Sequence, residues 1–391
     1  MNVLIIPSWY PTDDFPITGI FIKEQVSALA QHFPQSNFVV SLWGSHDRSL
    51  WWDIANLWRV SSKLEGLRKK SYSKQLSTNA YEYFTPAFTW TRKWRNGNLS
   101  QIIKANRENL QAFENKFGKI DVIHAHVSHP AGVIAMRLSA EFDVPYVITE
   151  HMGPFPFSSL QDGRGEPIPP MKEALKKASR VISVSGDLAQ KIKPYSRSEP
   201  LVIPNLIAEE HFTGRTREPC NIITYVGRMV KEKGIPELLR VWLRISEKYP
   251  DWQLKLIGDG PLTRQSEHPS IQWTGELTKS EISEHLRTSA FLILPSHFDN
   301  NPLVIIEAMA LGLPVLATKV GGIPEMVTSR TGLLTSQNDV EALRLAIEKM
   351  MNNYQSFDEK HIRKTFLEKY SSKMICHQIT AVYENLHSNK T

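Results

Sequence analysis

The sequence predicts an α/β protein built from two doubly wound, mainly parallel sheets. Short apolar runs alternate with helical patterns along most of the 391 residues, and most runs are rich in Val, Ile and Leu without strict alternation. Parallel strands covered on both faces have this composition, and the chain is too long for one ordinary core. The runs predicted as strands are "NVLIIP", "NFVVSLW", "DVIHAH", "PYVITEH", "RVISVS", "PLVIPN", "NIITYVG", "WQLKLIG", "AFLILPS" and "PVLAT".

A pause in this alternation divides the chain. Residues 204–219 form a polar stretch with proline and glycine, and the strand pattern begins again after it. We therefore predict a first domain over residues 1–203, a linker or hinge over 204–219 and a second domain over 220–365. Apolar residues at helical spacing predict a terminal helix within 366–391.

The composition excludes several classes of protein. Hydrophobic residues make up 41% of the chain and charged residues 22%, as in soluble globular proteins. The two cysteines, Cys220 and Cys376, provide neither a metal-binding spacing nor a disulfide framework, so we expect no metal site and a reducing, cytoplasmic compartment. The N-terminal run reads as a strand and not as a signal peptide, and no run is long enough to span a membrane. The net charge of +6 either favours anionic partners or reflects an ordinary basic surface.

Residues 43–100 depart from the strand–helix pattern, because tryptophans and basic residues gather there. One interpretation is an insertion whose aromatic side chains pack on the first domain. The other is a surface that meets a membrane interface or an acceptor, since Trp with Lys and Arg suits the depth of lipid headgroups. The residues concerned are Trp43, Trp51, Trp52, Trp58, Trp90 and Trp94, with Arg59, Lys63, Arg68, Lys69, Lys70, Lys74, Arg92, Lys93 and Arg95.

The stretch "FDNNPLVIIEAMALG" carries the first candidate site. It follows a strand pattern and predicts a helix that ends at Gly312, with Asn301 as N-cap and Pro302 as the first helical residue. The free N–H groups of such a helix face the carboxyl end of the strand, where open α/β sheets bind ligands. Asp299 and Glu307 can accept hydrogen bonds from the two ends of one ligand, as a sugar nucleotide would require. The alternative is that Glu307 is a structural acid with a partner elsewhere.

Two further loops carry candidate ligand-binding residues. In "YVGRMVKEKGIPELLRVW", Arg228 and Lys233 lie in the loop after a strand, where two cations suit a pyrophosphate. In "GIFIKEQVSALAQHF", Gly19 precedes a helix, and the lack of a side chain lets a ligand approach the backbone. Solvated cations and an ordinary turn glycine are the simpler interpretations of these two loops.

Histidines occur at the ends of two neighbouring predicted strands. His124 and His126 belong to "HAHVSHP", and His151 follows "VITE". A single histidine in such a place is usually structural, but three from adjacent strands also predict a site.

Taken together, several motifs resemble those of glycosyltransferase family 4, whose enzymes have the GT-B architecture and retain the anomeric configuration of the transferred sugar. These motifs are "VGRMVKEKG", "LIGDGP", "PSHFDNNPLVIIEAMALGLPVLAT", "VGGIPEMV" and "IPN". The N-terminal "PSWYP…GIFIKEQVSALA" and "IHAH…TEH" are similar to the bacterial branch that builds cell-surface polysaccharides. The resemblance implies two Rossmann-like domains facing across a cleft, with the last helix crossing back to the first domain.

The resemblance implies a role for each residue on the donor side. Arg228 and Lys233 would hold the diphosphate of the donor and offset charge on the departing nucleotide. Glu307 would bind the ribose hydroxyls, and Asp299 would contact the donor sugar. The family usually has Glu at the position of Asp299, so this chain departs from the pattern there. The backbone that would meet sugar and phosphate is that of Asn300, Asn301, Pro302, Leu303 and Val304.

On the side of the first domain, the resemblance implies that Gly19 meets the donor phosphate. His151 matches the histidine that the family places near the reacting sugar. His126 and Glu150 are assigned to the acceptor side. No Asp-x-Asp pair is present, so the metal clamp of the other large glycosyltransferase architecture is not expected.

We therefore expect a retaining, metal-independent glycosyltransferase without a cofactor, which uses a nucleoside-diphosphate sugar as donor. Its acceptor would be a glycan or a lipid-linked saccharide in cell-surface polysaccharide biosynthesis. Association with the inner face of the membrane follows only from the second interpretation of residues 43–100, and nucleic acid is not expected as a partner. Three alternatives remain: a nucleotide-sugar epimerase or phosphorylase of the same architecture, a non-catalytic nucleotide-sugar-binding protein, and a nucleic-acid-binding protein.

Overall fold

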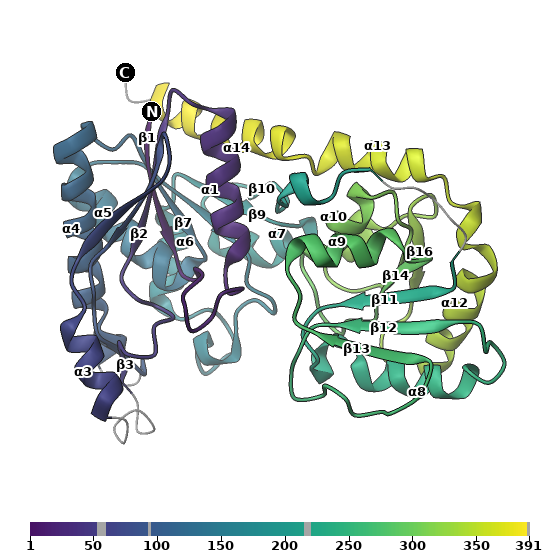
Figure 1. Cartoon of the computed structure of the whole chain (residues 1–391). Helices are drawn as coiled ribbons and strands as arrows, with labels where there is room; N and C mark the ends of the chain where they lie inside the picture. The colour runs from purple at the N-terminus through teal and green to yellow at the C-terminus, as the bar shows by residue number, and fades with distance from the viewer. Residues whose placement is uncertain (53–59, 93–94, 215–219, 389–391) are drawn as a thin grey trace. The chain divides into compact units, whose positions relative to one another are not determined.

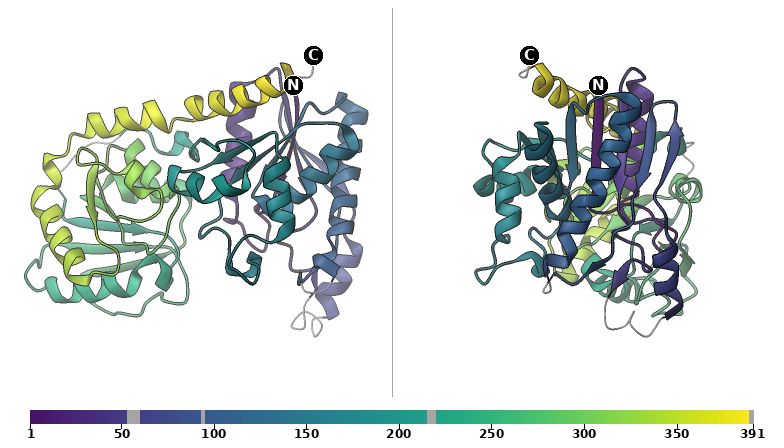
Figure 2. Two further views of the ribbon diagram at one scale, coloured as in Figure 1. Left: turned by 180° about the vertical axis from the view of Figure 1, so that it is seen from behind. Right: turned by 90° about the vertical axis from the view of Figure 1, so that its left-hand side faces the viewer.

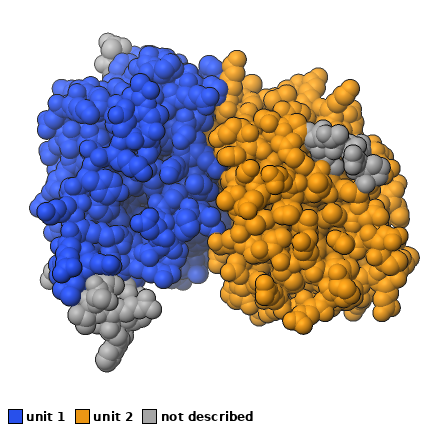
Figure 3. Space-filling view, viewed as in Figure 1, with its two compact units in different colours: residues 1–184, 189–203, 376–391 blue, residues 185–188, 204–375 orange. Residues whose placement is uncertain are grey.

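The chain divides into two compact units in the computed structural model, and Figure 3 colours them separately. Unit 1 contains Met1–Val184, Ala189–Ile203 and Cys376–Thr391, and unit 2 contains Ser185–Leu188 and Pro204–Ile375. The structure describes residues 1–52, 60–92, 95–214 and 220–388. Trp58, Arg59, Lys93 and Trp94, and the end of the predicted linker, lie outside these residues.

Unit 1 is built on an eight-stranded sheet with the order β10-β9-β8-β7-β1-β2-β5-β4. Every pair is parallel except β4 with β5. All residues of β7 and β8 are buried, which requires cover on both faces of the sheet, and Figure 2 shows the helices that provide it. The strands are β1 (Asn2–Pro7), β2 (Asn37–Leu42), β4 (Tyr72–Ser77), β5 (Ala80–Phe84), β7 (Val122–His126), β8 (Tyr146–Glu150), β9 (Arg180–Ser183) and β10 (Leu201–Val202).

The helices of unit 1 follow the strands in the expected α/β manner (Figure 1). Two short strands, β3 (Trp51–Trp52) and β6 (Thr89–Trp90), form a separate ribbon. The helices are α1 (Ile20–His32), α3 (Val60–Arg68), α4 (Leu99–Phe117), α5 (Val133–Phe142) and α6 (Pro169–Lys177). Helices α7 (Gly186–Ile192) and α14 (Ser372–Ser388) contain residues of both units.

The region 43–100 is more than an insertion, because it supplies two strands of the main sheet. β5 pairs parallel with β2, and β4 pairs antiparallel with β5 at the edge. Trp43 is buried and packs in the core, whereas Trp51 is 36% exposed. Part of the region therefore belongs to the core of unit 1, and part of it is surface. Contact of that surface with a membrane or an acceptor stays a prediction.

Helix α14 is fixed to unit 1 through a fully buried histidine. The Tyr383 hydroxyl lies 2.6 Å from Nδ1 of His124, and Thr149 Oγ1 lies 2.7 Å from Nε2. Both ring nitrogens are thus satisfied inside the sheet, as burial of a polar side chain requires. Burial lowers the pKa of His124 to about 3, so this histidine is neutral in the folded protein.

Unit 2 is built on a six-stranded sheet with the order β13-β12-β11-β14-β15-β16, and all its pairs are parallel. β14 and β15 are entirely buried. The strands are β11 (Ile222–Val226), β12 (Gln253–Ile257), β13 (Ile271–Gly275), β14 (Phe291–Leu294), β15 (Val315–Thr318) and β16 (Gly332–Thr335). The sequence did not predict β13 and β16.

The helices of unit 2 enclose one hydrophobic core, which includes the fully buried Trp242 and Phe291. Proline lies in the first turn of α8, where its missing N–H has no cost. No helix among the described residues is both long and apolar enough to span a lipid bilayer. The helices are α8 (Ile235–Ile245), α9 (Lys279–Arg287), α10 (Leu303–Ala310), α11 (Ile323–Met326), α12 (Val340–Asn353) and α13 (Glu359–Lys369).

The buried His124 predicts that unit 1 loses stability in acid. Its pKa is about 3 in the folded protein and near the ordinary value of 6.5 in the unfolded chain. The unfolded chain therefore binds more protons between these values, and the stabilisation that is complete above pH 6.5 decreases as the pH falls toward 3. We expect the free energy of unfolding to fall by up to about 1.4 kcal/mol per pH unit through this histidine.

Urea unfolding at pH 7.5, 6.5 and 5.5 tests this expectation, with the tyrosine fluorescence and far-UV circular dichroism of the whole chain as probes. His124→Asn keeps a polar atom near Nδ1 but cannot take up a proton. This variant should be less stable than the wild type at pH 7.5 and should depend less on pH. The exposed His377, changed to Gln, serves as the control and should leave the pH dependence unchanged. Equal slopes for His124→Asn and the wild type would contradict the assignment.

Candidate active site

The candidate donor site of unit 2 lies where the sheet order reverses. The chain runs from β11 outward through β12 to β13, and then returns to β14 on the other side of β11. Open α/β sheets bind ligands at the carboxyl ends of the strands at such a reversal. The loops after β11 and β14 carry the predicted residues Arg228, Lys233 and Asp299. The topology therefore brings together two segments that are far apart in sequence.

Within this site, the structure joins two of the predicted residues directly. Lys233 Nζ lies 2.5 Å from Asp299 Oδ2, and the Ser296 hydroxyl donates to the same oxygen at 3.2 Å. The two side chains are 28% and 15% exposed, so the pair is partly buried but still accessible to a ligand. Arg228 is exposed at the end of the loop after β11. An arginine and a lysine beside a carboxylate can bind both the phosphates and a hydroxyl group of one ligand.

Close backbone contacts fix the two loops in place. A Cβ on Gly234 would lie 2.0 Å from the carbonyl oxygen of Pro295, and one on Gly321 would lie 2.0 Å from that of Asp299. Both glycines have positive φ angles, of 72° and 50°. Side chains at these positions would push the two loops apart. The glycines of "EKG" and "VGG" therefore set the position of Asp299 against the loop after β11.

Helix α10 begins one residue later than predicted. Pro302 occupies the N-cap and the helix runs from Leu303 to Ala310, so the prediction of Asn301 as N-cap is wrong. The reason is a competing contact, because the Asn301 side chain accepts the backbone N–H of Asn205 at 2.8 Å. The first N–H groups of α10 have no acceptor within the helix and can donate to an anion.

Glu307 is buried within α10, and its charge is balanced by Lys279. Only 4% of its side chain is exposed, and Lys279 Nζ donates to Oε1. Lys279 also lies over the ring of Phe212, with Nζ 6.0 Å from the ring centroid. The buried carboxylate thus has the partner that its burial requires. Whether it also binds ribose stays a prediction.

The sequence analysis missed Lys279, although a local signal marks its place. Thr278 and Glu281 form a reciprocal capping box, in which each side chain binds the backbone N–H of the other residue. The pattern Thr-x-x-Glu predicts a helix that begins at residue 279. Its proximity to Glu307, 28 residues further along the chain, follows only from the fold.

In unit 1, Gly19 precedes α1 and has a structural role that is visible without a ligand. Its φ angle is 69°, and a Cβ at this position would lie 2.4 Å from the carbonyl oxygen of Trp9. The loop after β1 therefore folds back tightly on itself before the helix starts. At the start of α1, the N–H of Ile20 donates to the carbonyl of Ile17 at 3.3 Å, and that of Ile22 donates to the carbonyl of Gly19 at 3.0 Å. Contact of Gly19 with phosphate stays a prediction.

The histidines of β7 and β8 meet at the carboxyl edge of the sheet in unit 1. His126 Nδ1 lies 3.0 Å from His151 Nε2, and the two rings stack with centroids 5.3 Å apart. The ring of Phe21, at the start of α1, lies 4.7 Å from that of His151. Burial keeps the pKa of His126 well below its usual range, helped by the neighbouring His124 and His151. A neutral His126 can therefore hold His151 by a hydrogen bond in which only one ring donates.

Glu150 is fully buried, and it connects the segments that follow β7 and β8. Its carboxylate accepts the backbone N–H groups of Ser128, His151 and Met152, each at 2.9 Å. Burial raises the pKa of Glu150, and these hydrogen bonds work in the opposite direction. Such a carboxylate positions backbone, which includes that of His151. A direct role at the acceptor stays a prediction.

His129 is a further residue that the sequence analysis did not select. It lies in the turn after β7, beside Val127, whose φ angle of 77° is unusual for a β-branched residue. Burial lowers the pKa of His129 to about 4, and the charge of Arg92 contributes. His129 is the third histidine of "HAHVSHP", and this clustering of histidines is the sequence signal that could have identified it. Strained backbone of this kind is concentrated at functional sites.

The predicted residues thus form one group in each unit. Gly19, His126, Glu150 and His151 belong to unit 1, and Arg228, Lys233, Asp299, Glu307 and residues 300–304 belong to unit 2. Among the residues that the structure describes, no three His, Cys, Asp or Glu side chains gather in the manner of a metal site.

Comparison with known sequences finds a matching family model for each half of the chain. A sequence model described as "Glycosyltransferase Family 4" matches residues 70–211, and one described as "Glycosyl transferases group 1" matches residues 220–353. A protein of Bacillus subtilis (strain 168) named for teichuronic acid biosynthesis, the glycosyltransferase TuaC, is 28% identical over 362 residues. That match covers 89% of this chain and 88% of the relative.

Solved structures show the same fold over the full length. Sucrose-phosphate synthase from Thermosynechococcus elongatus matches with a TM-score of 0.73 at 19% identity, and each chain is covered completely. HepE from Anabaena, solved in complex with UDP, matches with a TM-score of 0.67 at 15% identity, over 98% of this chain and 100% of that one. The two family models, the TuaC match and the shared architecture of two parallel sheets agree, and the chain belongs to the family 4 glycosyltransferases and has the GT-B fold.

Proposed function

We propose that this glycosyltransferase moves a sugar from a nucleoside-diphosphate sugar to a glycan or lipid-linked acceptor, with retention of the anomeric configuration. The observation that carries the proposal is the Lys233–Asp299 pair at the reversal of the unit 2 sheet, beside the start of α10. The name of TuaC supports a role in cell-surface polysaccharide biosynthesis. The UDP complex of HepE supports a uridine nucleotide as one candidate donor.

The donor's diphosphate would lie between the loop after β11 and the start of α10. Arg228 can bind two phosphate oxygens at once, and Lys233 can bind a third while it remains near Asp299. The free N–H groups of α10 add donors without a charged side chain. Asp299 would accept a hydroxyl group of the sugar. Because Asp is one methylene shorter than Glu, the sugar must approach closely to the Lys233–Asp299 pair.

The reaction would be a substitution on one face of the sugar. The bond between the anomeric carbon and the phosphate oxygen breaks, and the acceptor oxygen forms its bond to the anomeric carbon on the same side. The proton of the acceptor hydroxyl passes to the leaving phosphate. Arg228 and Lys233 stabilise the charge that develops there, so the reaction needs neither a metal ion nor another cofactor. His151, held by His126, would lie near the reacting sugar.

Removal of either cation should slow the chemical step. Arg228→Ala and Lys233→Ala should lower kcat by about 10²–10³, the range for loss of one transition-state donor. Turnover is measured as release of nucleoside diphosphate from UDP-, GDP- and ADP-sugars, with and without EDTA. Proton NMR of the product gives the anomeric configuration.

The exposed neighbours Lys231 and Arg240 supply matched controls, and their Ala variants should retain wild-type turnover. Near-normal kcat for Arg228→Ala would defeat the assignment of the diphosphate site. Inversion at the anomeric carbon, or loss of activity in EDTA, would defeat the proposed mechanism. Conversion of the donor to a second nucleotide sugar without acceptor would indicate an epimerase instead.

Glu307 should recognise the ribose of the nucleotide. Glu307→Gln replaces a charged acceptor by a neutral one and should weaken binding of the ribonucleoside diphosphate by about tenfold. Calorimetric titration with the ribonucleotide and with its 2′-deoxy analogue separates ribose recognition from general damage to the site. The wild type should distinguish the two nucleotides, and the variant should not.

Glu284→Gln, at an exposed position of α9, serves as the control and should keep wild-type discrimination. Discrimination that survives in Glu307→Gln would leave Glu307 only its structural pairing with Lys279.

We also propose that unit 1 associates with the inner face of the cytoplasmic membrane. Leu64 and Leu67 of α3 are 50% and 66% exposed, and three basic residues follow them at 68–70. Exposed leucines beside a basic segment suit an anionic lipid surface. Such a location would bring a lipid-linked acceptor to the enzyme.

Substitution of the two leucines should release the protein from lipid vesicles. We expect Leu64→Asp/Leu67→Asp to lower the fraction that sediments with phosphatidylglycerol vesicles by about tenfold, because the two apolar side chains that would enter the lipid interface are lost. Leu345 of α12, which is 54% exposed, provides the control variant Leu345→Asp. Equal sedimentation of the double variant and the wild type would argue against this surface.

A further inference from the structure

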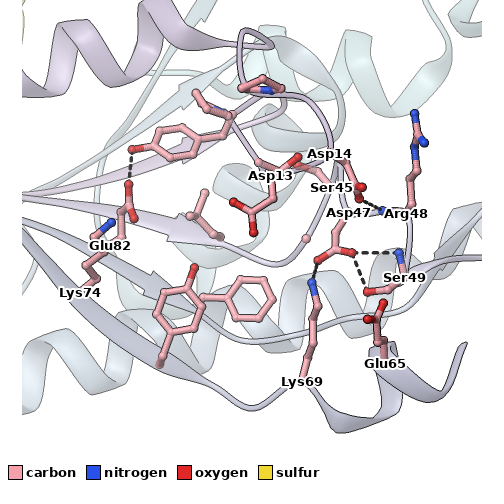
Figure 4. Close-up of a pocket in the computed structure, with 18 of the residues that line it drawn as sticks. Asp13, Asp14, Ser45, Asp47, Arg48, Ser49, Glu65, Lys69, Lys74 and Glu82 are labelled. Carbon is pink, nitrogen blue, oxygen red and sulfur yellow. Dashed lines mark hydrogen bonds and ion pairs between the residues drawn. The ribbon is translucent and has the colours of Figure 1, made fainter. Parts of the chain in front are cut away.

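A large pocket opens in unit 1 at the carboxyl ends of β1, β2 and β5 (Figure 4). Its volume is about 1070 Å³, at the upper end of the range for small-molecule sites. Its walls come from the loops after β1 and β2, from the end of α3 and from β4. All its lining residues belong to unit 1, and none of them is among the predicted catalytic or donor-binding residues. Four of them belong to the basic region for which the sequence analysis considered an acceptor surface: Arg68, Lys69, Lys70 and Lys74.

The floor of the pocket combines a buried carboxylate with aromatic rings. Glu82, on β5, is 6% exposed and accepts the Tyr10 hydroxyl at 2.7 Å. A carboxylate offers about four acceptor positions, so Glu82 retains capacity for the hydroxyl groups of a ligand. On the same strand, Phe84 stacks with Tyr72, with ring centroids 4.9 Å apart and planes inclined by 21°. Tyr72 is 51% exposed, so its ring is open to the apolar face of a sugar.

A second carboxylate faces the same space. Asp13 lines the pocket together with Glu82, and Figure 4 shows both side chains. Burial raises the pKa of Tyr72, and the negative charges of Glu82, Asp13 and Asp47 raise it further. Among the described residues, Asp13 has no hydrogen-bond or ion-pair partner for its carboxylate. Asp47 is already committed, since it accepts from Lys69 and from the Ser49 hydroxyl at 2.6 Å. Asp14 accepts the backbone N–H of Arg48 at 2.9 Å, and Glu65 is exposed on α3. We take Glu82 and Asp13 as the acceptors for a ligand.

The rim of the pocket is positively charged. Arg68, Lys70 and Lys74 are exposed lining residues. In the described part of the chain, no acid lies within ion-pair distance of these three side chains. Lys69, between them in sequence, is neutralised by Asp47. Lys74 lies opposite Glu82 in the β4–β5 pair, and Lys23 and Arg48 also line the pocket. The six basic lining residues outnumber the five acidic ones, Asp13, Asp14, Asp47, Glu65 and Glu82.

We propose that this pocket binds the sugar acceptor of the reaction, and that this acceptor is an anionic saccharide. Its hydroxyl groups donate to Glu82 and Asp13, one ring packs on Tyr72, and its negative group binds Arg68, Lys70 and Lys74. A sugar phosphate and a uronic acid share this chemistry. A neutral glycan would leave the cations of the rim unused. The assignment rests on the proposed glycosyltransferase function.

The test is binding of the full-length protein to an array of neutral, uronate-bearing and phosphate-bearing oligosaccharides. The wild type should bind anionic oligosaccharides above neutral ones, and the comparison of uronate with phosphate identifies the charged group. Lys70→Ala and Lys74→Ala should each weaken this binding by about tenfold, through loss of a charge-assisted hydrogen bond. Both positions are exposed, so the variants should fold normally.

Lys176→Ala, at an exposed site on α6, removes the same charge elsewhere in unit 1 and should bind as the wild type does. A preference for neutral oligosaccharides, unchanged binding by the Lys70 and Lys74 variants, or no binding at all would overturn the proposal. Nucleotide binding, followed by thermal shift with UDP, GDP and ADP, is measured on the same samples. Its absence would refute the proposed function, whereas loss of oligosaccharide binding alone would refute only the assignment of this pocket.

Discussion

The ion pair between Glu307 and Lys279 shows the constraint on which the donor site of unit 2 depends. A carboxylate within an apolar helix is costly unless a positive charge lies beside it, and Lys279 supplies that charge from the start of α9. Lys233 does the same for Asp299 between the loops after β11 and β14. These pairs, together with the glycine contacts at Gly234 and Gly321, hold charged groups at the strand ends without a ligand. The site is therefore largely preformed. A bound donor would replace some of these side-chain contacts with its own, and few side chains would have to become ordered on binding.

Much of the fold could be predicted from the apolar runs alone. The runs "NVLIIP", "NIITYVG" and "AFLILPS" became β1, β11 and β14, because parallel strands buried on both faces leave an unbroken apolar signal. β4 and β5 were missed for different reasons. β5 is entirely buried, but Glu82 interrupts its short apolar run. β4 is exposed along nearly its whole length, so "YSKQLS" carries polar residues and resembles a loop. β16 consists of only four residues, of which the first is Gly332, and this is too few for a periodic pattern.

The candidate site was predictable where its chemistry is local and unpredictable where it depends on tertiary contacts. Arg228, Lys233 and Asp299 follow strands directly, so their place at a sheet edge could be inferred from sequence. The partner of Glu307 could not, because Lys279 belongs to another helix and nothing in its own segment indicates the contact. Asn301 illustrates the same limit, since Asn205 takes the side chain that would otherwise cap α10. The pocket of unit 1 draws on four separate segments, and no single motif marks it.

The antiparallel strand β4 has a consequence for the behaviour of the protein in concentrated solution. It closes one side of the large sheet with an outward row of unpaired backbone groups, which in other proteins can recruit the strand of a second molecule. Here that border carries Lys74 and other exposed polar side chains along nearly its whole length. Repulsion between like charges, and the solvation of those side chains, disfavour hydrogen-bonded pairing between the edge strands of two molecules. The same strand that shapes one wall of the pocket in unit 1 thereby protects the chain against edge-to-edge aggregation.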